Sequence, residues 1–105
     1  MAVREFVIYL DEDQRNRYRH RHEWQQGRVT GFRIQYEAFI AGRWHPVVRY
    51  DTAHGQPHKG TLHPDGAQSK EMVSGYSNAD VLTIGQRDIM ENWMRYRAEY
   101  EKEMG

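Results

Sequence analysis

The chain has 105 residues, a length typical of one domain with a modest hydrophobic core. It carries 15 basic and 15 acidic residues, so its charge balance does not demand a polyanionic partner. It contains no cysteine, which excludes disulfides, thiolate metal sites and a thiol nucleophile, and which fits a cytoplasmic location. Three Trp, seven Tyr and three Phe supply large side chains for burial, so we expect a single folded domain over residues 1–105.

The charges are unevenly distributed along the chain. Residues 1–70 hold 11 Lys and Arg against 8 Asp and Glu, whereas residues 71–105 hold 4 against 7. An anionic partner is therefore permitted on the N-terminal part, where arginines gather. The apolar run from Phe6 to Leu10 is too short for a signal peptide or a membrane span, so we expect no membrane association.

Alternation of apolar and polar side chains predicts three strands, at residues 4–10, 17–24 and 28–40. The polar run at 11–16 and the glycine-containing run at 25–27 separate them as turns. Because the period is two, alternate residues share one face, which we expect to form the core. The side chains predicted on that face are Phe6, Ile8, Leu10, Tyr18, His20, His22, Trp24, Phe32, Ile34, Tyr36, Ala38 and Ile40.

A fourth strand is predicted at residues 43–51, after a tight turn at residues 41–42. Pro46 has no N–H to donate, which indicates that this strand lies at an edge or starts late. A last short hairpin is predicted from residues 58–63 and 69–73, closed by a Pro-Asp-Gly turn. Alternation in the fourth strand places Trp44, Val48 and Tyr50 on the core face and Val47, Arg49 and Asp51 on the opposite face.

After residue 77 the apolar period changes to that of a helix, which we expect from about 78 to 102. Ser77 with Asp80 three residues later resembles a capping box. The predicted fold is α+β: an antiparallel meander of four to six strands at about residues 4–73, with one long C-terminal helix packed on one face. If the tail of the helix overhangs the sheet, Tyr96 and Tyr100 offer an edge for a protein partner or a second copy.

The stretch RYDTAHGQPH, residues 49–58, is the densest group of reactive side chains. A histidine near a carboxylate can act as a general acid or base, because its pKa lies near neutrality and the carboxylate fixes its tautomer. Asp51, His54 and His58 are therefore the candidate catalytic residues, and Arg49 and Tyr50 are candidate substrate-binding residues. A polar turn with solvated histidines is the alternative interpretation.

Metal binding is a further alternative for the histidines. His54, His58 and His63 with a nearby Asp offer enough ligands, but glycine and proline among them oppose the helix that would make them converge. We therefore predict neither a metal nor any other cofactor. His20 and His22 lie two apart on a predicted strand, and we interpret them as packing side chains beside Tyr18.

Arginines form a second group on the strand faces opposite the core. Arg17, Arg19, Arg21, Arg33 and Arg49 would lie together on the open side of the sheet if the strands pair in order. Tyr9 and Phe39 share that side and could stack on bases, so the surface is a candidate for RNA. A mixed-charge solvated face is the alternative, because Glu23, Glu37 and Asp51 dilute the positive charge.

At WHPVVRYDTAHGQPHKGTLHPDG the chain resembles a family of small, uncharacterised prokaryotic proteins with a VRYD-x-AHG-x-x-H turn and a closing helix bearing ENW-x-RY. The likeness covers residues 1 to about 100. The Tyr-Asp pair followed by a His-containing turn is also similar to the TumE-like toxins of toxin–antitoxin pairs, small α+β proteins that act on RNA. The second resemblance implies Arg49, Tyr50, Asp51, His54 and His58 as site residues.

Two functions follow from these patterns. The first is a binding module or accessory subunit that uses the open sheet face and the Arg49–His58 turn. The second is a metal-independent endoribonuclease of toxin type, with His54 and His58 as acid and base, Asp51 orienting them and Arg49 clamping phosphate. RNA carries its own nucleophile, the 2′-OH, so positioned acid–base groups suffice for that reaction.

Overall fold

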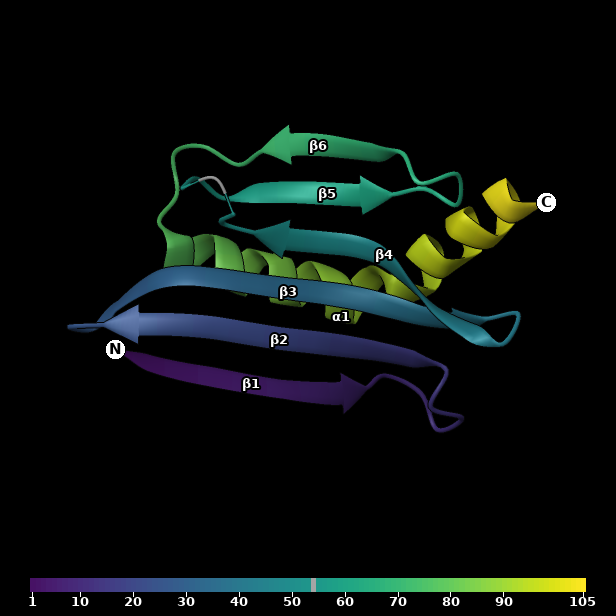
Figure 1. The fold of residues 1–105 in the computed structure, drawn as a ribbon, viewed down its shortest axis with the longest axis horizontal. Coiled ribbons are helices and arrows are strands. Elements are labelled where there is room, and N and C mark those ends of the chain that lie inside the picture. Colours follow the sequence, from purple (N-terminus) through teal and green to yellow (C-terminus); the bar gives the residue numbers. More distant parts are fainter. Residues whose placement is uncertain (54) are drawn as a thin grey trace.

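The computed structural model describes residues 1–53 and 55–105, and in them the chain forms one six-stranded sheet and one helix (Figure 1). Every strand pairs antiparallel with the next along the chain, so the order in the sheet is the order in the sequence. The predicted meander with a long C-terminal helix is confirmed. The elements are β1 (Ala2–Tyr9), β2 (Asn16–Gln25), β3 (Arg28–Ile40), β4 (Arg43–Asp51), β5 (His58–Leu62), β6 (Gln68–Met72) and α1 (Asn78–Met104).

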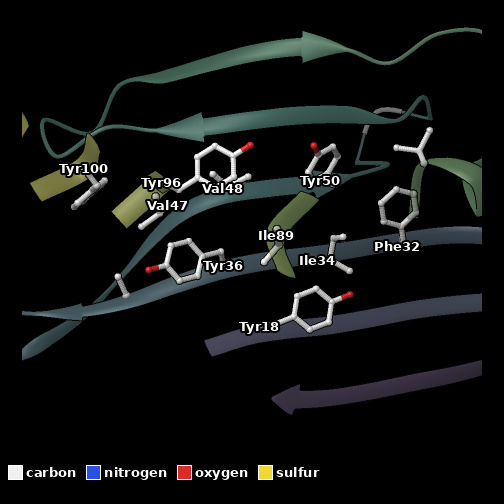
Figure 2. Packing of buried hydrophobic residues seen from close by; sticks show 12 residues of the cluster. Tyr18, Phe32, Ile34, Tyr36, Val47, Val48, Tyr50, Ile89, Tyr96 and Tyr100 are labelled. Atoms are coloured by element: carbon white, nitrogen blue, oxygen red, sulfur yellow. The ribbon is translucent and has the colours of Figure 1, made fainter. Parts of the chain in front are cut away.

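The helix α1 covers one face of the sheet, mainly over β3 and β4, and in Figure 1 it lies behind the sheet. The hydrophobic core fills the space between them, as Figure 2 shows, with side chains at alternate positions of β2, β3 and β4 meeting α1. Tyr18, Ile34, Tyr36 and Val48 are completely buried there. The face of the sheet turned away from α1 is called the open face below.

The start of α1 is fixed by the predicted cap. The Ser77 side chain accepts a hydrogen bond from the backbone N–H of Asp80, which satisfies one donor of the first turn. Farther along, Gly85 lets the helix approach the sheet closely, because a Cβ there would lie 2.8 Å from the Tyr50 ring. The helix continues to Met104, two residues beyond its expected end, with Gly105 as its C-cap. No helix in the described residues is both long enough and apolar enough to cross a membrane.

The face assignment within β4 was wrong for two residues. Tyr36 of β3 pairs with Val48, but Glu37 pairs with Pro46, so Val47 is an extra residue in β4 and the alternation shifts there. Trp44 therefore pairs with Phe39 on the open face instead of joining the core. Val47, expected on the open face, is instead 2% exposed and belongs to the core.

The structure also answers the questions of where Pro46 lies in the sheet and whether Tyr96 and Tyr100 are exposed. β4 lies inside the sheet and starts at Arg43, but β5 pairs only with Val48–Asp51, so Pro46 lies in a part of β4 that β5 does not reach. A missing N–H is tolerated at such a position. The expected exposed edge of Tyr96 and Tyr100 does not exist, because both side chains are buried against the sheet.

Candidate functional site

The open face carries the predicted arginines, because Arg19, Arg21, Arg33 and Arg49 alternate with core residues on β2, β3 and β4. A hollow of about 230 Å³ lies on this face across β3 to β6 and is called the basic hollow. Three cationic side chains and one carboxylate border it, so its charge is positive. Its lining residues are Arg33, Arg49, Asp51, Ala53, His58, Gly60, Gln68 and Lys70.

Asp51 and His58 lie directly opposite each other, on the neighbouring strands β4 and β5. Residues at opposite positions of antiparallel strands point to the same face, and their Cβ atoms lie about 5 Å apart. Asp51 also approaches Arg33, at 3.6 Å from the carboxylate oxygen Oδ2 to the guanidinium, and its Oδ1 accepts from the backbone N–H of Ala53. The structure thus brings together three predicted site residues, Arg49, Asp51 and His58, with Arg33. His54 lies outside the described residues.

Arg49 is held in place by a chain of polar side chains that runs across the open face. Its Nε donates to Gln35 Oε1 at 2.6 Å, and the Gln35 amide nitrogen donates to Glu37 at 2.5 Å. Glu37 also accepts from Arg17 and Arg19. We call this set, Arg17, Arg19, Glu37, Gln35 and Arg49, the arginine relay. It fixes the orientation of three guanidinium groups before any ligand arrives.

The charges within the arginine relay are set by their surroundings. Burial alone would raise the pKa of Glu37, but the bonds from Arg17 and Gln35 and the charge of Arg19 hold it below its ordinary value. Burial and the neighbouring charge of Arg33 lower the pKa of Arg49, a group that stays protonated at any physiological pH. The guanidinium groups of Arg33 and Arg49 lie close together beside one carboxylate, that of Asp51, and the excess positive charge favours an anionic ligand.

Arg33 connects the basic hollow with two more hollows on the open face. One of about 290 Å³ lies over β1 to β3, and one of about 270 Å³ lies at the start of β3 and the end of β4. Arg33 and Arg21 border both. Arg21 is paired with Glu5 and Glu23, whereas Arg19 is paired only through Glu37 among the described residues.

The other end of the open face is aromatic. The Trp44 ring contacts Phe39 and Tyr9, with ring centres 5.3 and 6.4 Å apart, and the guanidinium of Arg17 lies 3.8 Å from the Trp44 ring centre. Tyr9 and Phe39 were predicted on this face. Trp44 was missed, because nothing in the alternation of β4 signals the extra residue except Pro46 beside it.

Tyr50 does not reach the basic hollow, because its side chain lies on the helix side of the sheet. Its hydroxyl donates to Asp88 Oδ2 at 2.7 Å, and Asp88 also accepts from Tyr96 and Asn92 and approaches Lys59 at 3.5 Å. Burial opposes the charge of Asp88, but these donors hold its pKa below the ordinary value. Each donor has its acceptor, so this group ties α1 to β4 and β5 as a structural contact.

His20 and His22 are packing side chains, as we interpreted them from the sequence, and they lie on the helix side of the sheet. The Tyr18 hydroxyl lies 2.6 Å from His20 Nδ1, and His20 Nε2 lies 2.7 Å from His22 Nδ1. His63 is bonded to Glu103 and Ser69 and ties the β5–β6 turn to the end of α1. In the described part of the chain no group of three or more His, Asp or Glu side chains is placed to hold a metal ion.

A small antiparallel sheet backed by one helix, with a preorganised row of arginines on its open face, defines a compact α+β domain with a surface suited to anions. The chain belongs to the family described as Domain of unknown function (DUF7718), whose model matches residues 1–105. No curated protein and no solved structure matches the chain.

Proposed function

We propose that this protein is a binding module for RNA and that the ligand lies on the open face. The phosphates would contact the basic hollow, and unpaired bases would contact the aromatic end. The proposal goes beyond family membership and draws on the surface chemistry of this chain. It keeps Arg19, Arg21, Arg33 and Arg49 as ligand-binding residues and adds Lys70.

The arginine relay is the observation that carries the proposal. Ordinary surface arginines sample many rotamers and lose about 2 kcal/mol of side-chain entropy when they are fixed. Here Gln35 and Glu37 hold the guanidinium groups of Arg17, Arg19 and Arg49 in one orientation. Planar, fixed guanidinium groups suit phosphate oxygens, which accept two parallel hydrogen bonds.

The aromatic end favours a single strand over a duplex. Tyr9 is 45% exposed, and Trp44 presents the guanidinium of Arg17 as a second flat surface. Unpaired bases stack on such groups, whereas the bases of a duplex are already stacked on one another. From Arg33 to Phe39 the strand β3 spans roughly 20 Å at its usual rise, so one strand could reach both ends of the face.

The test is fluorescence anisotropy with a labelled single-stranded RNA of mixed sequence. The double variant Arg33→Gln, Arg49→Gln is expected to bind at least about tenfold more weakly than the wild type, because two phosphate contacts are removed. The double variant Arg87→Gln, Arg95→Gln, on the exposed side of α1, is the matched control and should bind like the wild type. Equal affinities of the three proteins, or no binding by the wild type, would contradict the proposal.

A polyanion that has phosphates but no bases distinguishes phosphate binding in the basic hollow from base stacking at the aromatic end. Tyr9→Ala is expected to weaken binding of single-stranded RNA severalfold and to leave binding of inorganic polyphosphate unchanged. If both ligands lose affinity equally, Tyr9 acts on the fold and not on a base.

Metal-independent cleavage of RNA is a second candidate, favoured by the direct pairing of Asp51 with His58 beside Arg49. In that reaction His58 would move a proton at the 2′-OH or at the leaving 5′-oxygen, with His54 as the expected partner. Asp51 would hold the tautomer of His58 and Arg49 the phosphate.

Cleavage is tested with the same RNA in the presence of a chelator, and by growth arrest when the protein is expressed. The double variant His54→Ala, His58→Ala should lose both effects, whereas His63→Ala, remote on the β5–β6 turn, should keep them. Intact RNA with the wild type, or equal effects from all three proteins, would leave binding as the function.

A further inference from the structure

The two edges of the sheet differ in how they are protected. Edge strands attract other strands, and proteins usually shield them by making them short or charged. The edge strand β6 follows that rule, because it has five residues, all exposed, and includes Lys70 and Glu71. The other edge, β1, has eight residues and no proline or glycine, and its only charged residues are Arg4 and Glu5, so the stretch from Phe6 to Tyr9 is uncharged.

The strand β1 exposes apolar side chains on both of its faces. Val3, Val7 and Tyr9 on the open face and Ile8 on the helix side are each 40% to 45% exposed. On the helix side, α1 lies over β3 and β4 and leaves Phe6 and Ile8 only partly covered. In the described residues β1 has a neighbouring strand on one side only, β2.

We infer that β1 pairs antiparallel with β1 of a second copy of this chain and joins two six-stranded sheets into one. This inference goes beyond RNA binding and does not depend on it. Antiparallel pairing of identical strands places a two-fold axis perpendicular to the sheet. Both helices then lie on one side, and the two open faces form one continuous surface on the other.

The sequence of β1 suits this pairing in two registers. Directly opposite residues must share a face, so the axis passes through one residue, which meets its own copy. An axis at Arg4 or Glu5 places like charges opposite each other, which is unfavourable. An axis at Phe6 pairs Val3 with Tyr9, and an axis at Val7 pairs Phe6 with Ile8, so both registers join apolar side chains.

The pairing would also bring together the hollows that lie over β1 to β3 on the two open faces. The hollow of about 290 Å³ is bordered by Glu5 and Val7 of β1 and by Arg19, Arg21 and Arg33. It lies beside the proposed interface, so two copies would place two such hollows on either side of the axis. A strand of RNA could then contact the arginines of both protomers across the seam formed by the two β1 strands.

Cysteine cross-linking tests the inference directly, because the chain has no cysteine of its own. Under mild oxidation Phe6→Cys or Val7→Cys, whichever lies on the axis, should form a covalent dimer in high yield, since its partner sulfur lies within disulfide range. The other of the two should cross-link far less, which identifies the register. Met72→Cys on β6 is the control and should form no covalent dimer.

Light scattering on the wild type, in the micromolar range, gives the second measurement. A dimer is expected, and the double variant Glu5→Lys, Val7→Lys, which places two lysines opposite each other in either register, should convert it to a folded monomer, with folding verified by circular dichroism. Met72→Lys should leave the dimer intact. A wild type that is monomeric throughout this range, or cross-linking at residue 72 equal to that at 6 and 7, would overturn the inference. A wild-type protein that is dimeric but does not bind RNA would contradict only the proposed function.

Discussion

His20 is a titratable side chain buried among aromatic rings. It is 5% exposed, the Phe6 ring stacks on it with centres 4.3 Å apart, and Tyr18 and His22 bond its two ring nitrogens. Burial, and after it the charges of His22 and Arg4, lower the pKa of His20 from 6.5 to about 4. The fold therefore holds His20 neutral.

The low pKa of His20 predicts loss of stability in mild acid. Between about pH 6.5 and about pH 4 the unfolded chain binds a proton that folded His20 does not, so stability is full above this range and falls as the pH drops through it. From neutrality to about pH 5 the free energy of unfolding should fall by at most about 2 kcal/mol. Urea unfolding at the two pH values measures this loss.

Two variants test whether His20 causes this loss of stability. His20→Phe removes the titrating group, so this variant should show a much smaller difference between the two pH values, even if it is less stable at both. His63→Ala, at the β5–β6 turn, should keep the full difference. An equal acid loss in the wild type and in His20→Phe would show that other groups cause it.

Sequence reasoning found single residues of the open face better than it found their partners. Arginines at alternate strand positions predicted that Arg19, Arg33 and Arg49 share a face, because the period of a strand fixes which side a residue takes. The role of Gln35 could not be predicted in this way. Its bond to Arg49 depends on the register between β3 and β4, and a single sequence does not contain that register. Its bond to Glu37 joins two residues on the same face of β3 and depends on the side-chain conformations that the neighbouring arginines select.

At the scale of elements, the six strands and the helix were predicted to within two residues at each end. Strong alternation and clear turn residues account for this. The exception lies inside β4, where Val47 is an extra residue and reverses the alternation. A β-bulge is not visible in the alternation of apolar and polar residues, so Trp44 and Val47 were each assigned to the wrong face.

The bulge makes a prediction that separates the two face assignments. Val47→Asp buries an unpaired carboxylate under α1 and should lower the free energy of unfolding by at least about 3 kcal/mol. Trp44→Ala, on the open face, should cost less. Ile84→Asp on the exposed side of α1 is the control for the charge itself. Chemical denaturation gives the order, which would be reversed if alternation held through β4.

The contact between α1 and the sheet makes a second prediction at this scale. Gly85→Ala places a Cβ 2.8 Å from the Tyr50 ring and 2.9 Å from Ile34, so the helix must move outward. We expect a loss of about 1 to 3 kcal/mol, although alanine favours an isolated helix by about 1 kcal/mol. Glu91→Ala, on the exposed side of α1, should change stability little. A Gly85→Ala protein that melts higher than the wild type would contradict the close approach.

At the scale of the whole molecule, the open face and the helix carry net charges of opposite sign. The chain is neutral in total, but on the open face Arg17, Arg19, Arg21, Arg33, Arg49 and Lys70 outnumber Glu5, Glu23, Glu37 and Asp51. The helix α1, behind the sheet, carries six acidic residues against four basic ones. A neutral protein can therefore present a positive surface to a polyanion and a negative one to solvent.

This separation predicts the salt dependence of RNA binding. A single strand releases about 0.7 counterions for each phosphate that a protein neutralises. If Arg33, Arg49 and Lys70 of the basic hollow each neutralise one phosphate, the logarithm of the affinity should fall with the logarithm of salt concentration with a slope of about −2. Arg49→Gln should make the slope shallower by about 0.7, and Arg95→Gln on α1 should not change it. Anisotropy titrations from about 50 to about 200 mM salt measure the slopes. An equal change in both variants would mean that the ligand responds to total charge and that the open face holds no defined site.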